Sequence, residues 1–202
     1  MSSVTFDESG DFLAAGDTGG RVVVFQRIDV AKAAAAEAAE DDSRKKRQKR
    51  GIKAEYGFYA EFQSHEAEFD CLKSMEVAEK INQIKFLPRF NSSLMLLTSN
   101  EKTIKLWKVH KKCIREPLSP TEEEEEEEDP TSVCIPKCEP VDISMCCEPK
   151  LVYANAHAFH INSVSLSSDQ ETFLSSDDLR IILWPFTSSN DAFSLCLLFF
   201  GS

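Results

Sequence analysis

The stretch from Glu79 to Trp107 constrains the fold most, because it predicts three short strands separated by turns. The first strand includes Ile81–Phe86, and the second is the continuous apolar run Leu94–Leu97, which is typical of a strand buried on both faces. The third, Thr103–Trp107, alternates polar with apolar residues and ends on a large aromatic. Because such a unit has apolar residues on both faces, it needs copies of itself beside it.

The same unit occurs twice more in the chain. The other copies consist of Val4–Phe6, Phe12–Asp17 and Arg21–Phe25, and of Ile161–Leu166, Thr172–Asp178 and Leu179–Trp184. The closing aromatics Phe25, Trp107 and Trp184 stand 82 and 77 residues apart. WD-type repeats are about 40–45 residues long, so each unit carries a long insertion. The pattern predicts an all-β fold, a WD-repeat β-propeller that is incomplete, since propellers need about 4–8 blades to close. The alternative is an ordinary all-β domain with accidental similarity.

We expect one partial propeller over residues 1–202, and its blade units lie near 1–26, 55–109 and 150–194. Residues 27–54 form a variable insertion, first Ala-rich and then basic. Its basic run, Arg44–Arg50, is either a nuclear-localisation or nucleic-acid patch or, as we favour, a solvated loop. Residues 110–149 form a second insertion, and its acidic run, Glu122–Asp129, should be solvated because it cannot fold by itself.

Charge and composition argue against several classes of protein. The net charge is −11, but Glu122–Asp129 contributes eight of the negative charges, so the acidic balance argues only weakly against nucleic-acid binding. The longest apolar run, Leu195–Phe200, is too short to span a bilayer. No secretory signal is visible at Met1, and an odd count of seven cysteines favours reduced thiols. We therefore expect a soluble, cytoplasmic protein, with the nucleus as a further location, and no nucleic-acid or membrane partner.

The cysteines do not have the spacing of a metal site. Cys134-x₃-Cys138 and Cys146-Cys147 provide no CxxC pair and have no histidine couple nearby, so we expect neither a metal nor a cofactor. The chain also contains no GxSxG, P-loop, GxGxxG or HExxH string. Nothing in these motifs supports catalysis, and we expect no enzyme activity.

Two histidines near the third unit permit a catalytic interpretation, since His157 and His160 could act with Asp177 or Asp178. A structural role is favoured for His157. A histidine before the first inner strand can bond to the aspartate of the turn and hold the strands in place. We assign turn and packing roles to His157, Asp177, Trp107 and Trp184.

Several long segments resemble one known family, the fifty-five kilodalton (PR-fifty-five) regulatory B subunits of protein phosphatase type two A. The segments that carry the resemblance are Gly16–Gln26 (GDTGGRVVVFQ), Phe62–Pro88 (FQSHEAEFDCLKSMEVAEKINQIKFLP), Ser99–Val109 (SNEKTIKLWKV) and Tyr153–Trp184 (YANAHAFHINSVSLSSDQETFLSSDDLRIILW). The resemblance covers nearly the whole chain except the two insertions and the last dozen residues.

The resemblance implies a seven-bladed propeller, of which this chain would hold about three blades, as in a truncated or alternatively spliced product. It implies a protein without catalytic activity that docks on the phosphatase scaffold (A) subunit and presents phosphoprotein substrates to the catalytic (C) subunit. A hairpin arm, here within residues 110–145, would grip the scaffold, and no single contact is assigned to it.

The resemblance also implies a groove on the top face of the propeller that recruits substrate. By motif position, its residues here are Glu79, Lys80, Phe159 and Asp178. Exposed carboxylates beside an aromatic suit the docking of a basic segment, although Asp177 and Asp178 could both simply cap a turn. Ala78 and Thr18 depart from the family pattern, and both departures would weaken electrostatic recruitment. A generic WD-repeat scaffold and an inert or competing truncated product remain as alternative functions.

Overall fold

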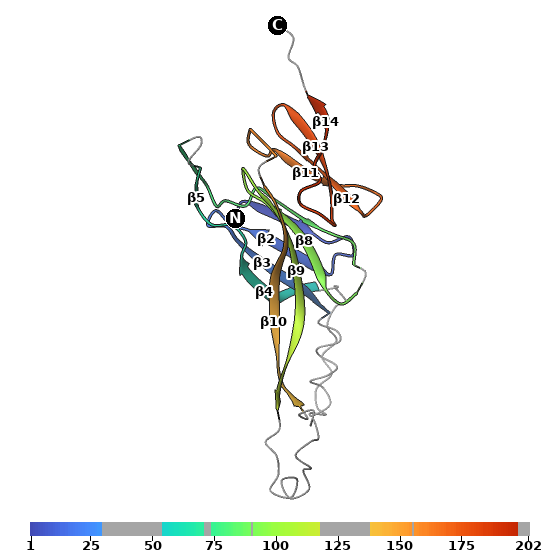
Figure 1. Ribbon diagram of the computed structural model, residues 1–202. Coiled ribbons are helices and arrows are strands. Elements are labelled where there is room, and N and C mark those ends of the chain that lie inside the picture. The colour runs from blue at the N-terminus through green and yellow to red at the C-terminus, as the bar shows by residue number, and fades with distance from the viewer. Residues whose placement is uncertain (30–53, 71–73, 90, 118–137, 155, 198–202) are drawn as a thin grey trace, which may run out of the picture.

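The computed structural model describes residues 1–29, 54–70, 74–89, 91–117, 138–154 and 156–197. Across them the strands form three four-stranded sheets and one two-stranded hairpin, and all of the pairings are antiparallel (Figure 1). The described sheets do not close into a ring, so the predicted all-β, incomplete propeller is confirmed. No helix in this part of the chain has the length and apolar character needed to cross a membrane.

The first sheet contains four strands in the order β1-β2-β3-β4. They are β1 (Ser3–Phe6), β2 (Phe12–Gly16), β3 (Arg21–Asp29) and β4 (Ala54–Gln63). The sequence places the start of the second unit near residue 55, whereas β4 pairs with β3 from Arg21↔Gln63 to Asp29↔Ala54 and is the fourth strand of the first sheet. The backbone groups on the free edge of β3 find their partners in the strand that returns after the insertion, and not in the next blade. The basic run at 44–50 lies outside the described residues.

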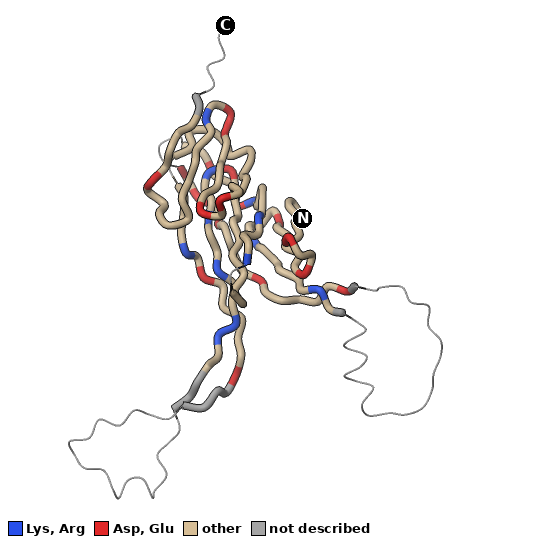
Figure 2. Tube along the Cα trace, turned by 90° about the vertical axis from the view of Figure 1, so that its right-hand side faces the viewer, with Lys and Arg blue, Asp and Glu red and all other residues tan. Residues whose placement is uncertain are grey.

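The second sheet has the order β10-β9-β8-β7 and is preceded by a small hairpin. The hairpin strands are β5 (Glu68–Asp70) and β6 (Met75–Val77), and the sheet strands are β7 (Gln83–Phe86), β8 (Leu94–Ser99), β9 (Ile104–Pro117) and β10 (Cys138–Tyr153). Strands β9 and β10 are much longer than their neighbours and project from the body as a paired arm (Figure 2). Residues 150–153, which the sequence places at the start of the third unit, are the end of β10. The acidic run lies outside the described residues.

The third sheet has the order β11-β12-β13-β14. Its strands are β11 (Ser163–Leu166), β12 (Thr172–Ser176), β13 (Arg180–Pro185) and β14 (Phe193–Leu197). In all three sheets, the first three strands fall where the repeated unit predicts them. The fourth strand of each sheet (β4, β10 or β14) lies outside the three strands of the repeated unit.

Two apolar clusters fill the spaces between successive sheets. One joins Val22, Val24 and Phe62 of the first sheet to Leu94, Leu96 and Trp107 of the second. The other joins Leu97, Ile104 and Leu106 of the second sheet to Val164, Phe173 and Trp184 of the third. Strand β8 therefore faces both clusters, which confirms that Leu94–Leu97 is buried on both faces. Because β8 contacts both clusters, it is the central apolar strand of the described structure. Full burial of each of its leucines contributes about 1.5–3 kcal/mol to the stability of the fold.

Candidate functional site

The turn between the second and third strands has the same design in all three sheets. Each begins with Asp17, Asn100 or Asp177, whose Oδ1 accepts hydrogen bonds from two backbone N–H groups further along the turn. The donors are Gly19 (2.9 Å) and Arg21 (2.9 Å), Lys102 (2.9 Å) and Thr103 (2.7 Å), and Leu179 (2.8 Å) and Arg180 (2.7 Å). One acceptor oxygen is enough for this turn, so Asp and Asn serve equally.

These turns are connected to the segments that enter the next sheet. The Ile81 N–H donates to the Asp17 carbonyl at 3.1 Å, and the Ile161 N–H donates to the Glu101 carbonyl at 2.8 Å. Residues just before these two isoleucines therefore lie beside a turn of the preceding sheet. Glu79 and Lys80 precede Ile81, and Phe159 precedes Ile161, so the predicted groove residues lie at the turn end of the sheets.

The structure places all four predicted groove residues at the surface. Lys80 and Asp178 are exposed, Glu79 is half-buried, and Phe159 is 47% exposed although it is aromatic. Asp178 Oδ1 accepts a hydrogen bond from Asn162 Nδ2 at 2.7 Å, which orients the carboxylate. Asp177 caps the turn, while its neighbour Asp178 faces solvent.

A pocket of about 220 Å³ opens between the β5–β6 hairpin, the β8–β9 turn and the segment before β11. Its lining includes the apolar side chains Met75, Val77 and Phe159 and the carboxylates Asp70, Glu76 and Glu101. Lys102 is paired with Asp70, and His160 Nδ1 lies 3.1 Å from Glu101 Oε2. Of the predicted groove residues, Phe159 lines this pocket, and Glu79, Lys80 and Asp178 do not.

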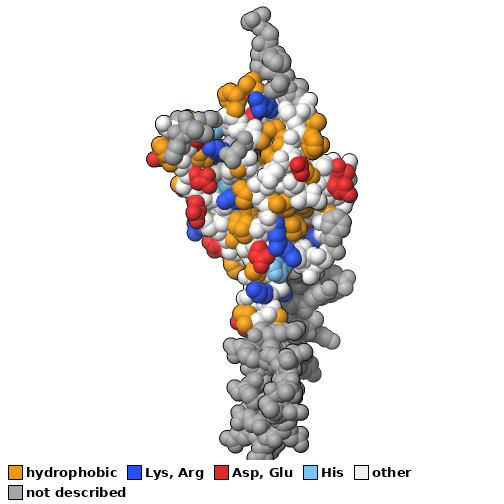
Figure 3. All heavy atoms as spheres, in the orientation of Figure 1, with side chains coloured by type: hydrophobic (Ala, Val, Ile, Leu, Met, Phe, Trp, Pro, Cys, Tyr) orange, Lys and Arg blue, Asp and Glu red, His pale blue; other side chains and the backbone are white. Residues whose placement is uncertain are grey.

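The β5–β6 hairpin is the part of this surface that sequence reasoning missed. Its residues mix aromatics with carboxylates and follow neither the helical nor the strand period, so the sequence gives no clear signal of a hairpin there. Figure 3 shows charged and hydrophobic side chains interspersed on the face in view.

His157 lies in a buried network that connects the turn of the third sheet to its closing tryptophan. His157 Nδ1 lies 2.8 Å from Asp177 Oδ2, and its Nε2 lies 2.6 Å from Ser175 Oγ. The Trp184 indole N–H donates to the same Ser175 Oγ at 2.7 Å. In the tautomer whose Nδ1–H donates to the Asp177 carboxylate, Nε2 accepts a hydrogen bond from the Ser175 hydroxyl. Both ring nitrogens are used internally, which leaves neither for a substrate.

Asp177 is ionised within this network. Burial raises the pKa of Asp177, but hydrogen bonds from His157 and from the backbone of Leu179 and Arg180 outweigh that effect, so the pKa is lowered from its ordinary value. An ionised carboxylate is the stronger acceptor for the imidazole N–H.

The second sheet contains a related but incomplete network around His65, which sequence reasoning did not single out. His65 is 1% exposed, its Nδ1 lies 3.1 Å from Ser64 Oγ, and Ser64 Oγ lies 2.7 Å from Thr98 Oγ1. His65 Nε2 and Trp107 Nε1 are buried without a hydrogen-bond partner within the described residues. Burial and the nearby charge of Lys105 lower the pKa of His65 to about 4. The only sequence signal was a histidine soon after an aromatic-rich strand.

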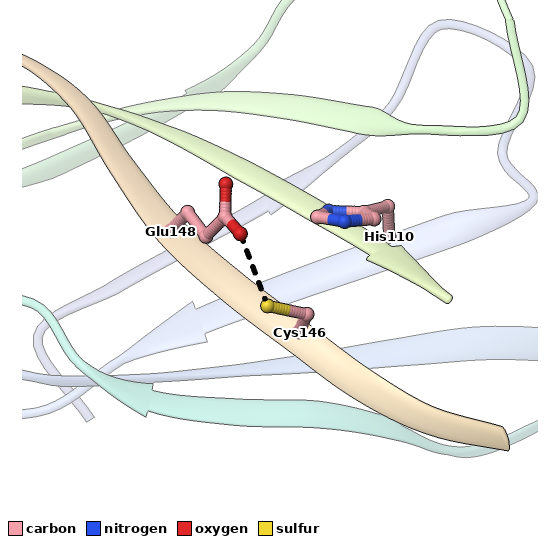
Figure 4. Close-up of side chains that lie close together, drawn as sticks. All are labelled: His110, Cys146 and Glu148. Atoms are coloured by element: carbon pink, nitrogen blue, oxygen red, sulfur yellow. Dashed lines mark hydrogen bonds between the residues drawn. The ribbon is translucent and has the colours of Figure 1, made fainter. Parts of the chain in front are cut away.

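A third group of polar side chains lies at the root of the arm. The pairing of β9 with β10 sets Cys146 opposite His110, and Glu148 follows two residues later on the same side of β10 (Figure 4). One ligand atom of each side chain lies within 4.8 Å of the others. Hydrogen bonds from Lys150 and Cys146 lower the pKa of Glu148 to about 2, so its carboxylate is ionised. The spacing of His110, Cys146 and Glu148 along the sequence could not predict this group, because only the register of β9 and β10 brings the three side chains together.

The chain is similar to known proteins over nearly all of its length. The family model "WD domain, G-beta repeat" matches residues 148–185, which run from the end of β10 through β13. The B beta isoform of the 55 kDa regulatory subunit of serine/threonine-protein phosphatase 2A from Sus scrofa is 45% identical over 199 residues, and that from Carassius auratus is 43% identical over 199 residues. Each alignment covers 96% of this chain and 42% of the relative.

Among solved structures, the crystal structure of Sqt1 from Chaetomium thermophilum is similar with a TM-score of 0.45 and 16% identity, and the match covers 91% of this chain and 30% of that chain. This likeness is too weak to carry an argument. The curated relatives are more informative, although the chain spans only about two fifths of their length. By its sequence, this chain is similar to the 55 kDa regulatory B subunits of protein phosphatase 2A over nearly all of its own length, and residues 148–185 match a WD repeat.

Proposed function

We propose that this chain is a non-catalytic regulatory subunit of protein phosphatase 2A, which binds the scaffold and catalytic subunits and recruits phosphoprotein substrates to them. The observation that carries the proposal is the 43–45% identity to regulatory B subunits across 96% of the chain. The absence of a recognised catalytic motif in the sequence is in keeping with it.

The arm formed by β9 and β10 is the proposed contact with the scaffold subunit. On the described part of the arm, Ile114 is 42% exposed and Ile143 is 66% exposed. They lie on opposite faces of the hairpin, because Ile114 pairs with Asp142, the residue before Ile143. Lys111 and Lys112 are also exposed on β9. Exposed apolar side chains flanked by charges on a projecting hairpin are typical of a surface that another protein covers.

The turn end of the sheets is the proposed contact with substrates. Asp178 and Glu79 present carboxylates, and the nearby pocket combines Phe159 with the carboxylates of Glu76 and Glu101. A peptide segment with basic and apolar residues complements such a surface in both charge and polarity.

The first experiment is a pull-down of the whole 202-residue chain against the purified scaffold–catalytic core, with circular dichroism on the same sample. We expect binding together with a strand-rich spectrum. Ile143→Asp should weaken core binding, because it places a charge at an exposed apolar contact. A folded chain that does not bind the core would contradict the proposal and favour a generic WD-repeat scaffold.

The second experiment separates recruitment from assembly. Asp178→Lys should impair capture of phosphoprotein substrates while core binding is unchanged, and Asp191→Lys, an exposed carboxylate before β14, is the matched control. If the chain binds the core and displaces a full-length regulatory protein of this family without capturing any substrate, it acts as a competitor and the recruitment proposal is wrong.

A further inference from the structure

We propose that His110, Cys146 and Glu148 form a binding site for a thiophilic divalent cation at the root of the arm, with Zn²⁺ as its occupant. The proposal is independent of the regulatory function, because it concerns only side chains of the β9–β10 hairpin. Three observations support it: the strand register, the chemical types of the ligands and an unpaired buried nitrogen.

The strand register brings the three side chains together on one face of the hairpin. Cys146 pairs directly with His110, and directly opposed residues on antiparallel strands have their side chains on the same side of the sheet. Glu148 is two residues from Cys146 and therefore shares that side. The ligand atoms all lie within 4.8 Å of one another. Small rotamer changes bring such atoms to the separations of a tetrahedral site with metal–ligand distances of about 2.0–2.3 Å.

The other face of the hairpin is fixed against the core. Met145 and Cys147, which alternate with Cys146, pack against the cluster between the first and second sheets. His110, Cys146 and Glu148 are each half-buried, so they are held by the strands but accessible from solvent. Because the three side chains are accessible from solvent, an ion can reach them without any opening of the core.

The ligand set suits zinc better than calcium or magnesium. One imidazole nitrogen, one thiolate and one carboxylate oxygen are all common zinc ligands, and a fourth position remains for water. Magnesium and calcium prefer oxygen ligands alone. Three protein ligands of these types therefore indicate a borderline-soft cation and not a hard one.

The hydrogen bonds already present show how the ion would be held. Cys146 Sγ donates to Glu148 Oε1 at 3.4 Å (Figure 4). Lys150 Nζ donates to Glu148 Oε2 at 2.8 Å. Binding would release the Cys146 thiol proton to solvent and place Zn²⁺ between Sγ and Oε1, with no change of oxidation state. Lys150 would keep Oε2 and hold the carboxylate in its orientation, as partners of metal-bound carboxylates commonly do.

His110 supplies the independent observation. Its Nδ1 is buried and has no hydrogen-bond partner within the described structure. A buried polar nitrogen without a partner costs free energy, and a metal ion or a water is what normally relieves that cost. With the ion bound, the two strands are joined where the arm leaves the body, and the direction of the arm is fixed.

The test uses the whole chain, stripped of metal with a chelator and titrated with Zn²⁺ by calorimetry and with Co²⁺ by absorption spectroscopy. We expect one equivalent of either ion per chain, with a thiolate-to-cobalt charge-transfer band. Cys146→Ser should weaken binding by about 100-fold and remove the band. His110→Gln and Glu148→Gln should each weaken binding while the band persists at saturating Co²⁺.

Two controls separate this site from other thiols. Cys113→Ser removes an exposed cysteine of the same hairpin and should leave binding unchanged. The double variant Cys134→Ser, Cys138→Ser tests two further cysteines, of which Cys138 is the first residue of β10. Circular dichroism shows whether each variant is folded. If Cys146→Ser does not fold, the His110→Gln and Glu148→Gln variants still test the site. Unchanged affinity in the His110 and Glu148 variants, or loss of binding in the double variant, overturns the proposal.

Discussion

The second and third sheets use the same turn but differ in the polar network beneath it. In the third sheet, hydrogen bonds connect Asp177, His157, Ser175 and Trp184 in series, and the polar side-chain groups of these four residues all have partners. In the second sheet, Asn100, Thr98 and Trp107 occupy the corresponding strand and turn positions. There Asn100 Nδ2 donates to the Ala78 carbonyl at 3.2 Å, and Trp107 Nε1 has no partner among the described residues.

The difference shows that the turn and the network have separate requirements. The turn needs one side-chain oxygen, so Asn100 caps it as well as Asp177 does. The network needs a carboxylate that can also accept from an imidazole, and it needs a histidine close to the turn. In the second sheet the β5–β6 hairpin separates His65 from the start of β7, and the carboxylate is absent. The first sheet has Ala15 and Phe25 at the equivalent positions and so has no buried polar group there to satisfy.

The largest expected effect comes from breaking the complete network. Asp177→Ala removes the partner of His157 and the cap of the turn, and should lower the free energy of unfolding by about 3–5 kcal/mol. Urea unfolding followed by circular dichroism measures the loss. Asp178→Ala, at the exposed neighbouring position, should change stability by less than about 0.5 kcal/mol. Equal losses in the two variants would show that the buried network does not stabilise the sheet.

The next effect concerns the contact that positions His65 against the first sheet. Gly20 has a φ of +79°, and a Cβ there would lie 2.0 Å from the carbonyl oxygen of His65. Gly20→Ala should therefore cost about 3 kcal/mol, the sum of left-handed backbone strain and overpacking. Gly10, with a φ of +71° and open space around it, is the matched control, and Gly10→Ala should cost only about 1–2 kcal/mol. Similar losses in the thermal or urea unfolding of both variants would mean that the Gly20–His65 contact is not tight.

The pH dependence of stability should reveal the burial of His65. The pKa of His65 is about 4 in the folded chain and near its ordinary 6.5 when unfolded, so the unfolded state binds the extra proton between these values. Stability contributed by neutral His65 is present above pH 6.5 and is lost as pH falls toward 4, by up to about 3 kcal/mol. Urea unfolding over this range should show a steeper decline in the native chain than in His65→Gln. Parallel declines would show that His65 titrates normally.

The smallest effect compares the two tryptophans. Trp184→Phe removes an indole N–H that donates to Ser175, and the lost hydrogen bond should add about 1–2 kcal/mol to the cost of the smaller ring. Trp107→Phe removes an N–H that has no partner in the described structure, so only the packing loss is expected. The difference between the two unfolding free energies isolates the hydrogen bond. A larger loss for Trp107→Phe would mean that its indole nitrogen is paired in solution.

The repeated pattern predicted most of the fold, and the reason is local. Strand positions such as Leu94–Leu97 follow from alternation, apolar runs and turn residues, which the sequence displays directly. The repeat did not predict the sheet to which β4 and β10 belong, because these strands return after long insertions and their partner depends on which sheet edge is free. The surface positions of Phe159 and Asp178 agree with their predicted groove role, which itself stays a prediction.

The sequence by itself determined the all-β class, the repeat, the similarity to regulatory B subunits and the capped turns, because these depend on residue type and short-range spacing. Only the tertiary structure decided which distant side chains meet. His157 reaches Ser175, His65 lies against Gly20, and Cys146 lies opposite His110, a residue on the other strand of the arm. Such contacts depend on strand register and on sheet order, in which a shift of one residue turns every side chain to the opposite face.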